Sequence, residues 1–332
     1  MMNTPLVSVL VPVYRVERYL ERCVRSLFEQ TYQNLEYVFV DDATDDASID
    51  ILRRVMTDYP ERCDSVKIIR HDSNKGLAAA RNTAVASCRG DFVTHVDSDD
   101  WMITEAIGLL VKKQQETDAD IVTAEAYDYL DGEIQDHASG GWNLDKDTLL
   151  KGLLTHRLST SLWRRLIRRN LYSDHHVVCD ERGSGGEDFQ VLPQLVYYAK
   201  KVSGINDKIY YYNKSNQQSI SNNAESDIAI QIQGMVSVMN VVSFFSDKES
   251  CLYSLVAGME VRNIHYRMNY NVSKRNRDGY FVFLNYMKSS DSRYWGQVRW
   301  NCLFVRCVES HYSTMLLKNA FRHLLYRAKE MV

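Results

Sequence analysis

Along the first 125 residues, short runs of apolar residues alternate with segments in which apolar residues recur every three or four positions. Such a run predicts a buried strand, and such a recurrence predicts an amphipathic helix. The predicted strands are residues 7–13, 35–40, 66–69, 92–96 and 120–124. The predicted helices between them are residues 16–29, 49–56, 78–82 and 104–116. This alternation indicates an α/β fold, a Rossmann-like and mostly parallel sheet with helices on both faces.

Beyond residue 129 the pattern is less regular. The predicted elements there are a polar loop over 131–143, a helix over 149–169, a helix over 191–199 and a last strand over 208–213. From residue 225 onward only helical patterns occur. We therefore expect two parts, an α/β domain spanning residues 1–222 and a helical C-terminal region spanning residues 223–332.

Composition narrows the class of protein. Apolar residues make up 45% of the chain and charged residues 25%, which is ordinary for a globular protein. No run of eighteen apolar residues occurs, so no transmembrane helix is expected, and the first residues do not resemble a signal peptide. Seven cysteines without paired CxxC spacing indicate reduced thiols. We therefore expect a cytoplasmic protein.

The net charge of −3 is unevenly distributed, because the segment from Lys274 to the end holds eleven Lys or Arg against four Asp or Glu. A basic end on an acidic body favours an anionic partner, such as the inner face of the plasma membrane, and residues 315–327 form an amphipathic basic segment. A solvated helical face explains the same pattern. The Met-rich and Tyr-rich C-terminal helices are typical of core or of homodimer contacts. No nucleic-acid partner is expected.

Polar side chains follow three of the predicted strands where each strand ends. Tyr14 follows the first strand, and Asp41 and Asp42 follow the second. Because the carboxyl ends of parallel strands meet at one edge of a sheet, we expect these residues to lie together. An aromatic face can stack on a nucleobase, and a carboxylate can accept a hydrogen bond from a base N–H. This edge of the sheet therefore has the residues of a nucleoside site.

The third of these strand ends is that of the predicted strand 92–96, which is followed by a crowded acidic cluster, Asp97, Asp99 and Asp100. Carboxylates so close together repel one another unless a cation or strong donor lies among them. Hard oxygen ligands suit Mg²⁺ or Mn²⁺, and such ions usually also bind substrate phosphates. The alternative is an acidic turn that caps the next helix. Neither GxxxxGK[ST] nor GxGxxG after the first strand occurs, so we expect a metal ion, and not a glycine loop, to hold the phosphates.

Several motifs in sequence order resemble the signatures of family 2 glycosyltransferases, over roughly residues 5–220. They are residues 7–14, 30–32, 40–42, 74–82 and 97–100. Later segments are similar to the bacterial polysaccharide branch of the family, namely residues 163–166, 186–188, 211–212 and 219–221. The resemblance implies a GT-A fold and an inverting, metal-dependent enzyme that uses a nucleotide-diphosphate sugar. It makes residues 1–222 the catalytic domain.

The resemblance also implies roles for residues at the nucleotide end of the site. Pro12 and Tyr14 would line the base pocket, and Asp42 would accept a hydrogen bond from the uracil N3–H. Asp41 and Lys75 would lie near the nucleoside. Asx turns within a loop are the alternative for Asp42, and plain core packing is the alternative for Tyr14.

For the reacting end, the resemblance implies that Asp99 is the direct metal ligand. Asp97 would complete the metal site and approach the ribose or a metal-bound water. Asp188 would be the general base that deprotonates the acceptor hydroxyl, with Glu187 beside it. An acidic pair that opens a helix also suits the helix dipole, which is the alternative for these two residues.

We therefore expect a glycosyltransferase of the hexosyltransferase type in cell-surface polysaccharide synthesis. The donor would be a UDP-sugar with Mn²⁺ or Mg²⁺, and the acceptor a saccharide or a polyprenyl-diphosphate-linked saccharide. Two alternatives stay open. A sugar nucleotidyltransferase would need a Gly-rich loop with a Lys after the first strand, where residues 12–15 stand instead. A non-catalytic sugar-nucleotide binding protein would lack a base, whereas Glu187 and Asp188 are present.

Overall fold

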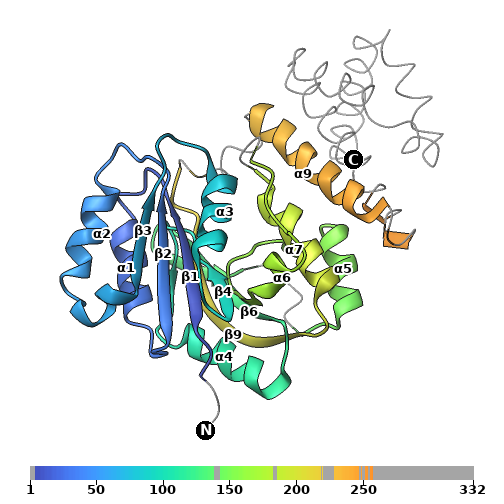
Figure 1. Cartoon of the computed structure of the whole chain (residues 1–332), viewed down its shortest axis with the longest axis horizontal. Helices are drawn as coiled ribbons and strands as arrows, with labels where there is room; N and C mark the ends of the chain where they lie inside the picture. Colours follow the sequence, from blue (N-terminus) through green and yellow to red (C-terminus); the bar gives the residue numbers. More distant parts are fainter. Residues whose placement is uncertain are drawn as a thin grey trace, which may run out of the picture. The chain divides into compact units, whose positions relative to one another are not determined.

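The computed structural model describes residues 4–137, 143–181, 185–217, 219, 228–246, 248, 251–252 and 255–256. The chain divides into two compact units, Met1–Phe244 and Phe245–Val332, and the sheet belongs to the first (Figure 1). The predicted boundary between residues 222 and 223 lies outside the described residues, as do the basic segment from Lys274 and the amphipathic segment 315–327. These expectations, and the expected homodimer contacts, stay predictions.

The first half of the sheet is parallel, in the order β3-β2-β1-β4. Its strands are β1 (Val7–Val13), β2 (Leu35–Asp41), β3 (Val66–Arg70) and β4 (Phe92–His95). Every residue of β1, β2 and β4 is buried. Strands that are covered on both faces need apolar side chains on both faces, which is why apolar residues predominate here, with few polar ones such as Ser8 and Glu36 among them. The four strands predicted for this half are confirmed.

Helices cover both faces of this half (Figure 1). They are α1 (Leu20–Phe28), α2 (Ser48–Met56), α3 (Leu77–Ser87) and α4 (Ala106–Thr117), and a 3₁₀ turn, η1 (Pro60–Ser65), precedes β3. Apolar residues of α1, α2 and α4 share one core with the alternate residues Val7, Val9, Val11 and Val13 of β1. Helix α3 packs on β1 and β2 with small residues, because its buried positions include Ala78, Ala79, Ala80 and Ala84. The predicted α/β fold is confirmed.

The second half of the sheet is mixed, in the order β4-β8-β6-β9-β5. Its strands are β5 (Trp101–Met102), β6 (Ile121–Leu130), β7 (Glu133–Asp136), β8 (Arg165–Arg168) and β9 (Val202–Asn213). Strand β8 runs antiparallel to both β4 and β6, while β9 runs parallel to β6. Strands β5 and β7 also run antiparallel to their partners, β9 and β6, so the sheet is mostly parallel with β8 inverted at its centre and β5 and β7 inverted at its margin.

The helix predicted over residues 149–169 is wrong. Helix α5 (Lys146–Leu154) begins at Asp145, whose side chain accepts a hydrogen bond from the Thr148 N–H, and it ends well before residue 169. Strand β8 and the short helix α6 (Asn170–Ser173) follow. Pairing of β8 with β4 and β6, which lie far away in the sequence, overrides the local helical periodicity.

The polar loop predicted over residues 131–143 contains strand β7, which forms a hairpin with β6. Asp131 and Gly132 form its two-residue turn, and both have positive φ, 49° and 99°. Asp-Gly is a favoured pair for such turns, because both positions need left-handed backbone. The hairpin was missed because its residues are polar and exposed.

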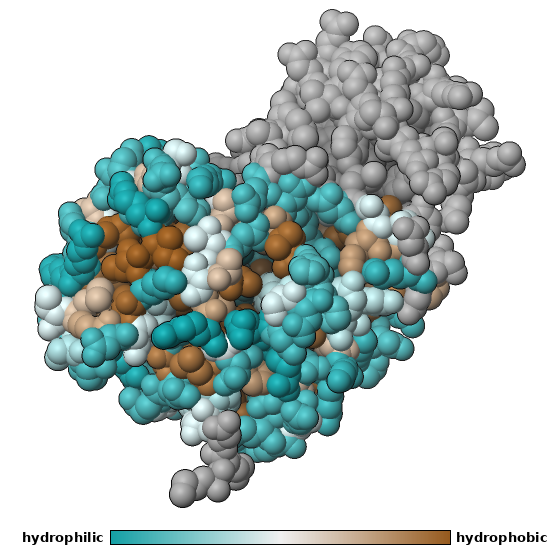
Figure 2. All heavy atoms as spheres, viewed as in Figure 1, coloured by the Kyte–Doolittle hydropathy of each residue, from teal (hydrophilic) through white to brown (hydrophobic). Residues whose placement is uncertain are grey.

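Helix α7 (Glu187–Tyr198) belongs to the first unit. Helix α9 (Ile228–Ser246) begins in the first unit and ends two residues beyond its last residue, Phe244. Hydrophilic residues cover much of the coloured surface in Figure 2, with hydrophobic residues in patches between them. Within the residues that the structure describes, no helix combines the length and the apolar character needed to cross a membrane.

Candidate active site

A cleft of about 1090 Å³ opens where the parallel strands end. It brings together the predicted site residues except Asp41. Those that line it are Pro12, Tyr14, Asp42, Lys75, Asp97, Asp99, Glu187 and Asp188. They come from the ends of β1, β2 and β4, from the turn before α3 and from the first turn of α7. The grouping agrees with the rule that open α/β sheets bind ligands beyond the carboxyl ends of their strands.

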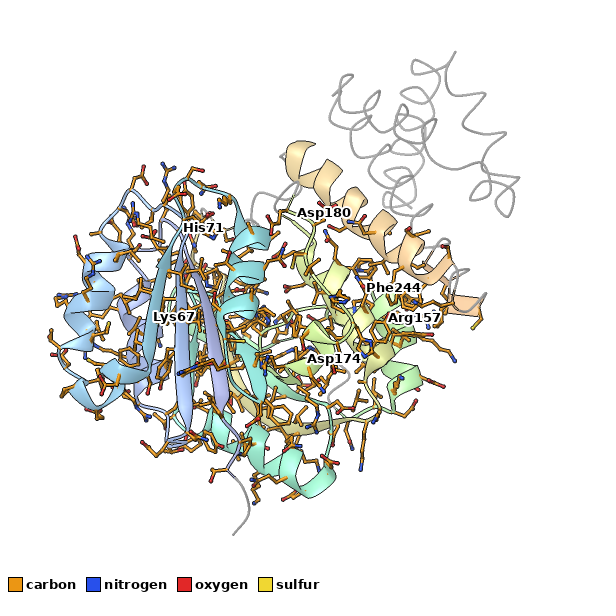
Figure 3. All side chains as sticks on the ribbon, in the orientation of Figure 1. Lys67, His71, Arg157, Asp174, Asp180 and Phe244 are labelled. Atoms are coloured by element: carbon orange, nitrogen blue, oxygen red, sulfur yellow. The ribbon has the colours of Figure 1, made fainter. Side chains whose placement is uncertain are left out.

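Asp42 holds the turn that leads into α3. Its Oδ1 accepts from the Lys75 N–H at 2.8 Å, and its Oδ2 accepts from the Gly76 N–H at 2.8 Å. The Nδ1 of His71, labelled beyond the end of β3 in Figure 3, lies 2.7 Å from Oδ1. Only 3% of Asp42 is exposed. The carboxylate therefore fixes the position of Lys75 while it lines the cleft.

Tyr14 lines the cleft as an exposed aromatic residue, with 38% of its surface accessible. The neighbouring Arg15 adopts a left-handed backbone, with φ of 51°, and its guanidinium pairs with Asp45 at 2.7 Å. That guanidinium also lies 5.2 Å from the centroid of the Tyr14 ring. An exposed aromatic ring at a strand end can stack on a flat ligand.

Asp41 does not line the cleft. It is the last residue of β2, and its carboxylate accepts from Arg70 at 2.5 Å and from the Thr44 N–H at 2.8 Å. Successive side chains of a strand point to opposite faces, so Asp41 and Asp42 cannot both face the same ligand from an extended backbone. The carboxylate of Asp41 therefore stabilises the loop that follows β2 and does not face the cleft.

The acidic cluster splits into one inward and two cleft-facing carboxylates. Asp100 is buried and accepts from the Tyr210 hydroxyl and from the Asn213 N–H, both at 2.7 Å, and burial raises its pKa well above the ordinary value. Asp99 accepts from the Asn216 side chain at 2.8 Å. Burial first, and then the charge of Asp97, raise the pKa of Asp99 to about 6. Asp97 accepts from Arg81 at 3.0 Å, and the carboxylates of Asp97 and Asp99 both line the cleft, where a ligand could bind them.

The donor set fits a hard divalent cation that is shared with a phosphate ligand. Among the described residues, no group of three or more His, Cys, Asp or Glu is arranged to enclose a metal ion. Mg²⁺ and Mn²⁺ are commonly held by one or two carboxylates together with substrate phosphates and water. The raised pKa of Asp99 shows that its charge is poorly compensated by the protein alone. A cation at Asp97 and Asp99 would supply the missing compensation.

Arg81 is a site residue that the sequence analysis did not single out. It is 2% exposed and projects from α3 toward three carboxylates. Its Nη2 lies 3.0 Å from Asp97 and 3.4 Å from Asp188, and its Nε lies 3.7 Å from Glu187. A charged residue on the buried face of an alanine-rich helix could have indicated it, because such a charge must find partners inside.

Asp188 occupies the second position of α7, with one oxygen satisfied and the other not. Its Oδ2 accepts from the Leu162 N–H at 3.1 Å, while its Oδ1 is buried without a hydrogen-bond partner. Burial, opposed by Arg81 and assisted by the charges of Glu187 and Asp97, raises the pKa of Asp188 to about 7. This Oδ1 lies 3.4 Å from Arg81 Nη2, and a carboxylate that lines a cleft and has a pKa near neutrality suits a general base.

Helix α9 supports the loop that carries this acidic pair. The Ser237 hydroxyl donates to the Gly185 carbonyl at 2.9 Å and accepts from the Gln190 side chain at 2.7 Å. Gly186 has φ of 76°, and a Cβ on it would lie 2.9 Å from the Ser237 Oγ. Both the backbone conformation and the close approach of α9 therefore require glycine at the start of α7.

Comparison with known proteins gives consistent results. Residues 8–179 match the sequence model of glycosyl transferase family 2. Glycosyltransferase GlyG of Streptococcus pneumoniae is 28% identical over 222 residues, covering 63% of this chain and 71% of its own. Putative glycosyltransferase EpsH of Bacillus subtilis is 32% identical over 216 residues, covering 64% and 61%. Glycosyltransferase GlyA of S. pneumoniae is 31% identical over 221 residues, covering 62% of this chain and 30% of its own, so the match spans only part of these relatives.

Solved structures share the fold at low sequence identity. S. aureus TarS 1–349 in complex with UDP-GlcNAc has a TM-score of 0.72 and 19% identity, covering 96% of this chain and 92% of its own. Mannosyltransferase PcManGT of Pyrobaculum calidifontis in complex with GDP-Man and Mn²⁺ has a TM-score of 0.56 and 14% identity, covering 97% and 88%. These likenesses confirm the predicted GT-A arrangement of the sheet and helices.

Proposed function

The chain belongs to glycosyl transferase family 2, and on this premise we propose that it transfers a sugar, with inversion, from a UDP-sugar to a hydroxyl of a saccharide acceptor. One observation carries the proposal: a single cleft holds an exposed aromatic ring, a carboxylate pair suited to a cation and a carboxylate suited to a base. TarS and the Pyrobaculum mannosyltransferase were each solved with a nucleotide sugar, which supports this class of donor.

At the donor end, Tyr14 would stack on the nucleobase while Asp42 and Lys75 stand at the nucleoside. Asp97 and Asp99 would hold Mn²⁺ or Mg²⁺, which when bound neutralises the charge that develops on the leaving diphosphate. Arg81 fixes the position of Asp97 through the ion pair of its Nη2 with the carboxylate. The Mn²⁺ in the Pyrobaculum mannosyltransferase supports a metal at a site of this fold, and the metal of this chain is our proposal.

At the acceptor end, Asp188 would take the proton of the attacking hydroxyl. Its Oδ1 has no hydrogen-bond partner and its pKa of about 7 leaves much of it ionised at neutral pH. The Leu162 N–H, bound to Oδ2, fixes the direction of the carboxylate. A base on the face of the sugar opposite the leaving diphosphate would give one displacement and inversion. Glu187 would support Asp188 through their common partner Arg81.

The product would be a cell-surface polysaccharide. Chondroitin synthase of Escherichia coli is 37% identical over 107 residues, and poly(ribitol-phosphate) beta-glucosyltransferase of Bacillus spizizenii is 28% identical over 210 residues. Chondroitin is a polysaccharide, which supports our proposal of a saccharide acceptor, free or linked to a polyprenyl diphosphate. We also propose that the enzyme acts in the cytoplasm, at the inner face of the plasma membrane.

Nucleotide-dependent thermal stabilisation tests the donor assignment. We expect UDP with Mn²⁺ to raise Tm by about 5 °C at a hundredfold excess over Kd, and GDP to raise it less. The Asp99→Asn variant should lose the metal-dependent part of this shift and keep its own Tm, because burial already disfavours the charge it removes. Asp50→Asn, at an exposed position outside the cleft, is the matched control. Shifts insensitive to chelation and to Asp99→Asn would exclude the metal site.

A further inference from the structure

A stack of aromatic rings contributes two of the residues that line the cleft. Trp163 is stacked on Tyr210 with ring centroids 4.6 Å apart and on Tyr212 with centroids 5.4 Å apart, all within 14° of parallel. Tyr210 is fully buried and Trp163 is 5% exposed, whereas Tyr212 is partly exposed, and both Trp163 and Tyr212 line the cleft. The predicted site residues include no member of this stack.

His137 forms a wall beside these rings. It meets Trp163 edge-on at 5.2 Å and Tyr212 edge-on at 5.9 Å, and it also lines the cleft. Its Nδ1 lies 2.6 Å from Asp128, which also accepts from Lys214 at 2.6 Å. The wall is therefore held by a charged network beyond the cleft.

The aromatic stack adjoins both the candidate base Asp188 and the acidic cluster at Asp97. On one side, Trp163 directly follows Leu162, whose N–H binds Asp188. On the other side, the Tyr210 hydroxyl accepts from the Asp97 N–H at 3.0 Å and donates to Asp100. Arg81 bridges Asp97 and Asp188, so these two carboxylates are near neighbours, and the aromatic stack has a hydrogen-bonded or adjoining residue at each of them.

The chemical character of this region suits a pyranose ring. One face of a pyranose presents C–H groups that pack on the electron-rich face of an aromatic ring, and its hydroxyls need polar partners at the edge. The residues Ser159, Thr160 and Ser161 line the cleft beside Trp163 and offer hydroxyl and backbone groups. A flat apolar surface with a few polar groups beside it is typical of small-molecule sites.

We propose that Tyr212, supported by the buried ring of Trp163, forms the platform of the acceptor subsite, on which a pyranose ring of the acceptor saccharide stacks with a hydroxyl directed at Asp188. The inference rests on the proposed glycosyl transfer and adds its acceptor class. The acceptor is favoured over the donor sugar because Trp163 adjoins the residue that holds the base, while the donor must stay attached to a diphosphate at Asp97 and Asp99.

Variants of one strand position test the platform. Tyr212→Leu keeps apolar bulk and removes the ring, whereas Tyr212→Phe keeps the ring. Tyr211→Leu is the matched control, because Tyr211 lies on the same strand, stacks on Trp101 on the other face and does not line the cleft. Each protein is assayed for UDP-sugar hydrolysis in water and for transfer to methyl pyranosides of glucose, galactose and N-acetylglucosamine. Saturation-transfer NMR of the same pyranosides, with UDP and Mn²⁺ present, reports their binding directly.

We expect Tyr212→Leu to raise the KM for the pyranoside about tenfold and to weaken its NMR signal, with hydrolysis and the KM for the UDP-sugar changed less than about twofold. Tyr212→Phe and Tyr211→Leu should resemble the unmodified protein. An equal rise in the KM for the UDP-sugar would move the platform to the donor and overturn the inference. Absence of binding by every pyranoside would overturn it as well. Failure of the proposed function is distinct, since the unmodified protein would then neither bind UDP nor hydrolyse a UDP-sugar.

Discussion

Asp42 and Asp188 are two carboxylates of one cleft with opposite surroundings. Asp42 accepts two backbone N–H groups and contacts His71, so both of its oxygens are bound. Asp188 has one oxygen bound by Leu162 and one buried without a hydrogen-bond partner. A carboxylate surrounded by donors mainly holds the structure together, whereas one that lacks them is costly to bury and is available for chemistry. The two should therefore respond oppositely to the same change of Asp to Asn.

Asp188→Asn should have the largest effect, a fall in kcat of about a thousandfold, because an amide cannot take the acceptor proton. Its Tm should not fall, because the substitution removes a charge that burial disfavours. Steady-state transfer assays and thermal unfolding measure the two quantities. A variant that keeps more than a tenth of the unmodified kcat would remove Asp188 from its role as base.

Arg81→Met should destabilise the protein by about 3–5 kcal/mol, because Asp97, Glu187 and Asp188 would lose the buried cation that they share. Urea unfolding followed by fluorescence measures this loss. Arg81→Lys keeps the charge with fewer donors and should lose less. Equal stability of Arg81→Met and the unmodified protein would show that the three carboxylates do not depend on Arg81.

Asp42→Asn should cost about 2 kcal/mol of stability, because an amide nitrogen would replace one acceptor oxygen and face N–H donors. The turn at Lys75 and Gly76 would loosen, and the KM for the UDP-sugar should rise while kcat changes little. Unfolding and initial-rate measurements on this variant, set beside those on Asp188→Asn, test the comparison directly. Similar profiles for the two variants would contradict it.

The pH dependence should show the smallest effect. Since the pKa of Asp188 is raised to about 7, kcat/KM should increase about tenfold between pH 6 and pH 8 as the base loses its proton. The same raised pKa means that the contribution of this carboxyl to stability is present at acid pH and is lost as pH rises through about 7. Asp188→Asn should abolish that loss. A rate profile that is flat over this range would indicate a different base.

The residues of the proposed nucleotide site could be predicted from the sequence more fully than those of the proposed acceptor subsite. Tyr14, Asp42 and Asp97 each follow a buried strand, so the local pattern of apolar and polar residues already places them at one edge. Trp163 lies in a segment predicted as helix, and its contacts depend on the pairing of β8 with distant strands. Long-range pairing of this kind leaves little trace in a short window of sequence.

Arg81 and Asp41 show a second limit. The motif that contains Arg81 was recognised, but the side chain's partners come from a strand end and from α7, so its role became visible only in three dimensions. Asp41 and Asp42 look equivalent in the sequence, and only the direction of the side chain separates them. The helices and strands of the parallel half of the sheet could be predicted from the pattern of apolar residues, because each element buries its own apolar face.

Strand β9 constrains how the acceptor preference of such an enzyme can evolve. Tyr210 and Asn213 hold Asp100, and Tyr212 belongs to the proposed platform, so most positions near the end of this strand are already committed. Changes there would disturb the acidic cluster together with sugar selection. Diversification is therefore expected in the neighbouring segment 159–161, whose side chains line the cleft without supporting the carboxylates, and a mutational library for altered acceptor use should begin with those residues.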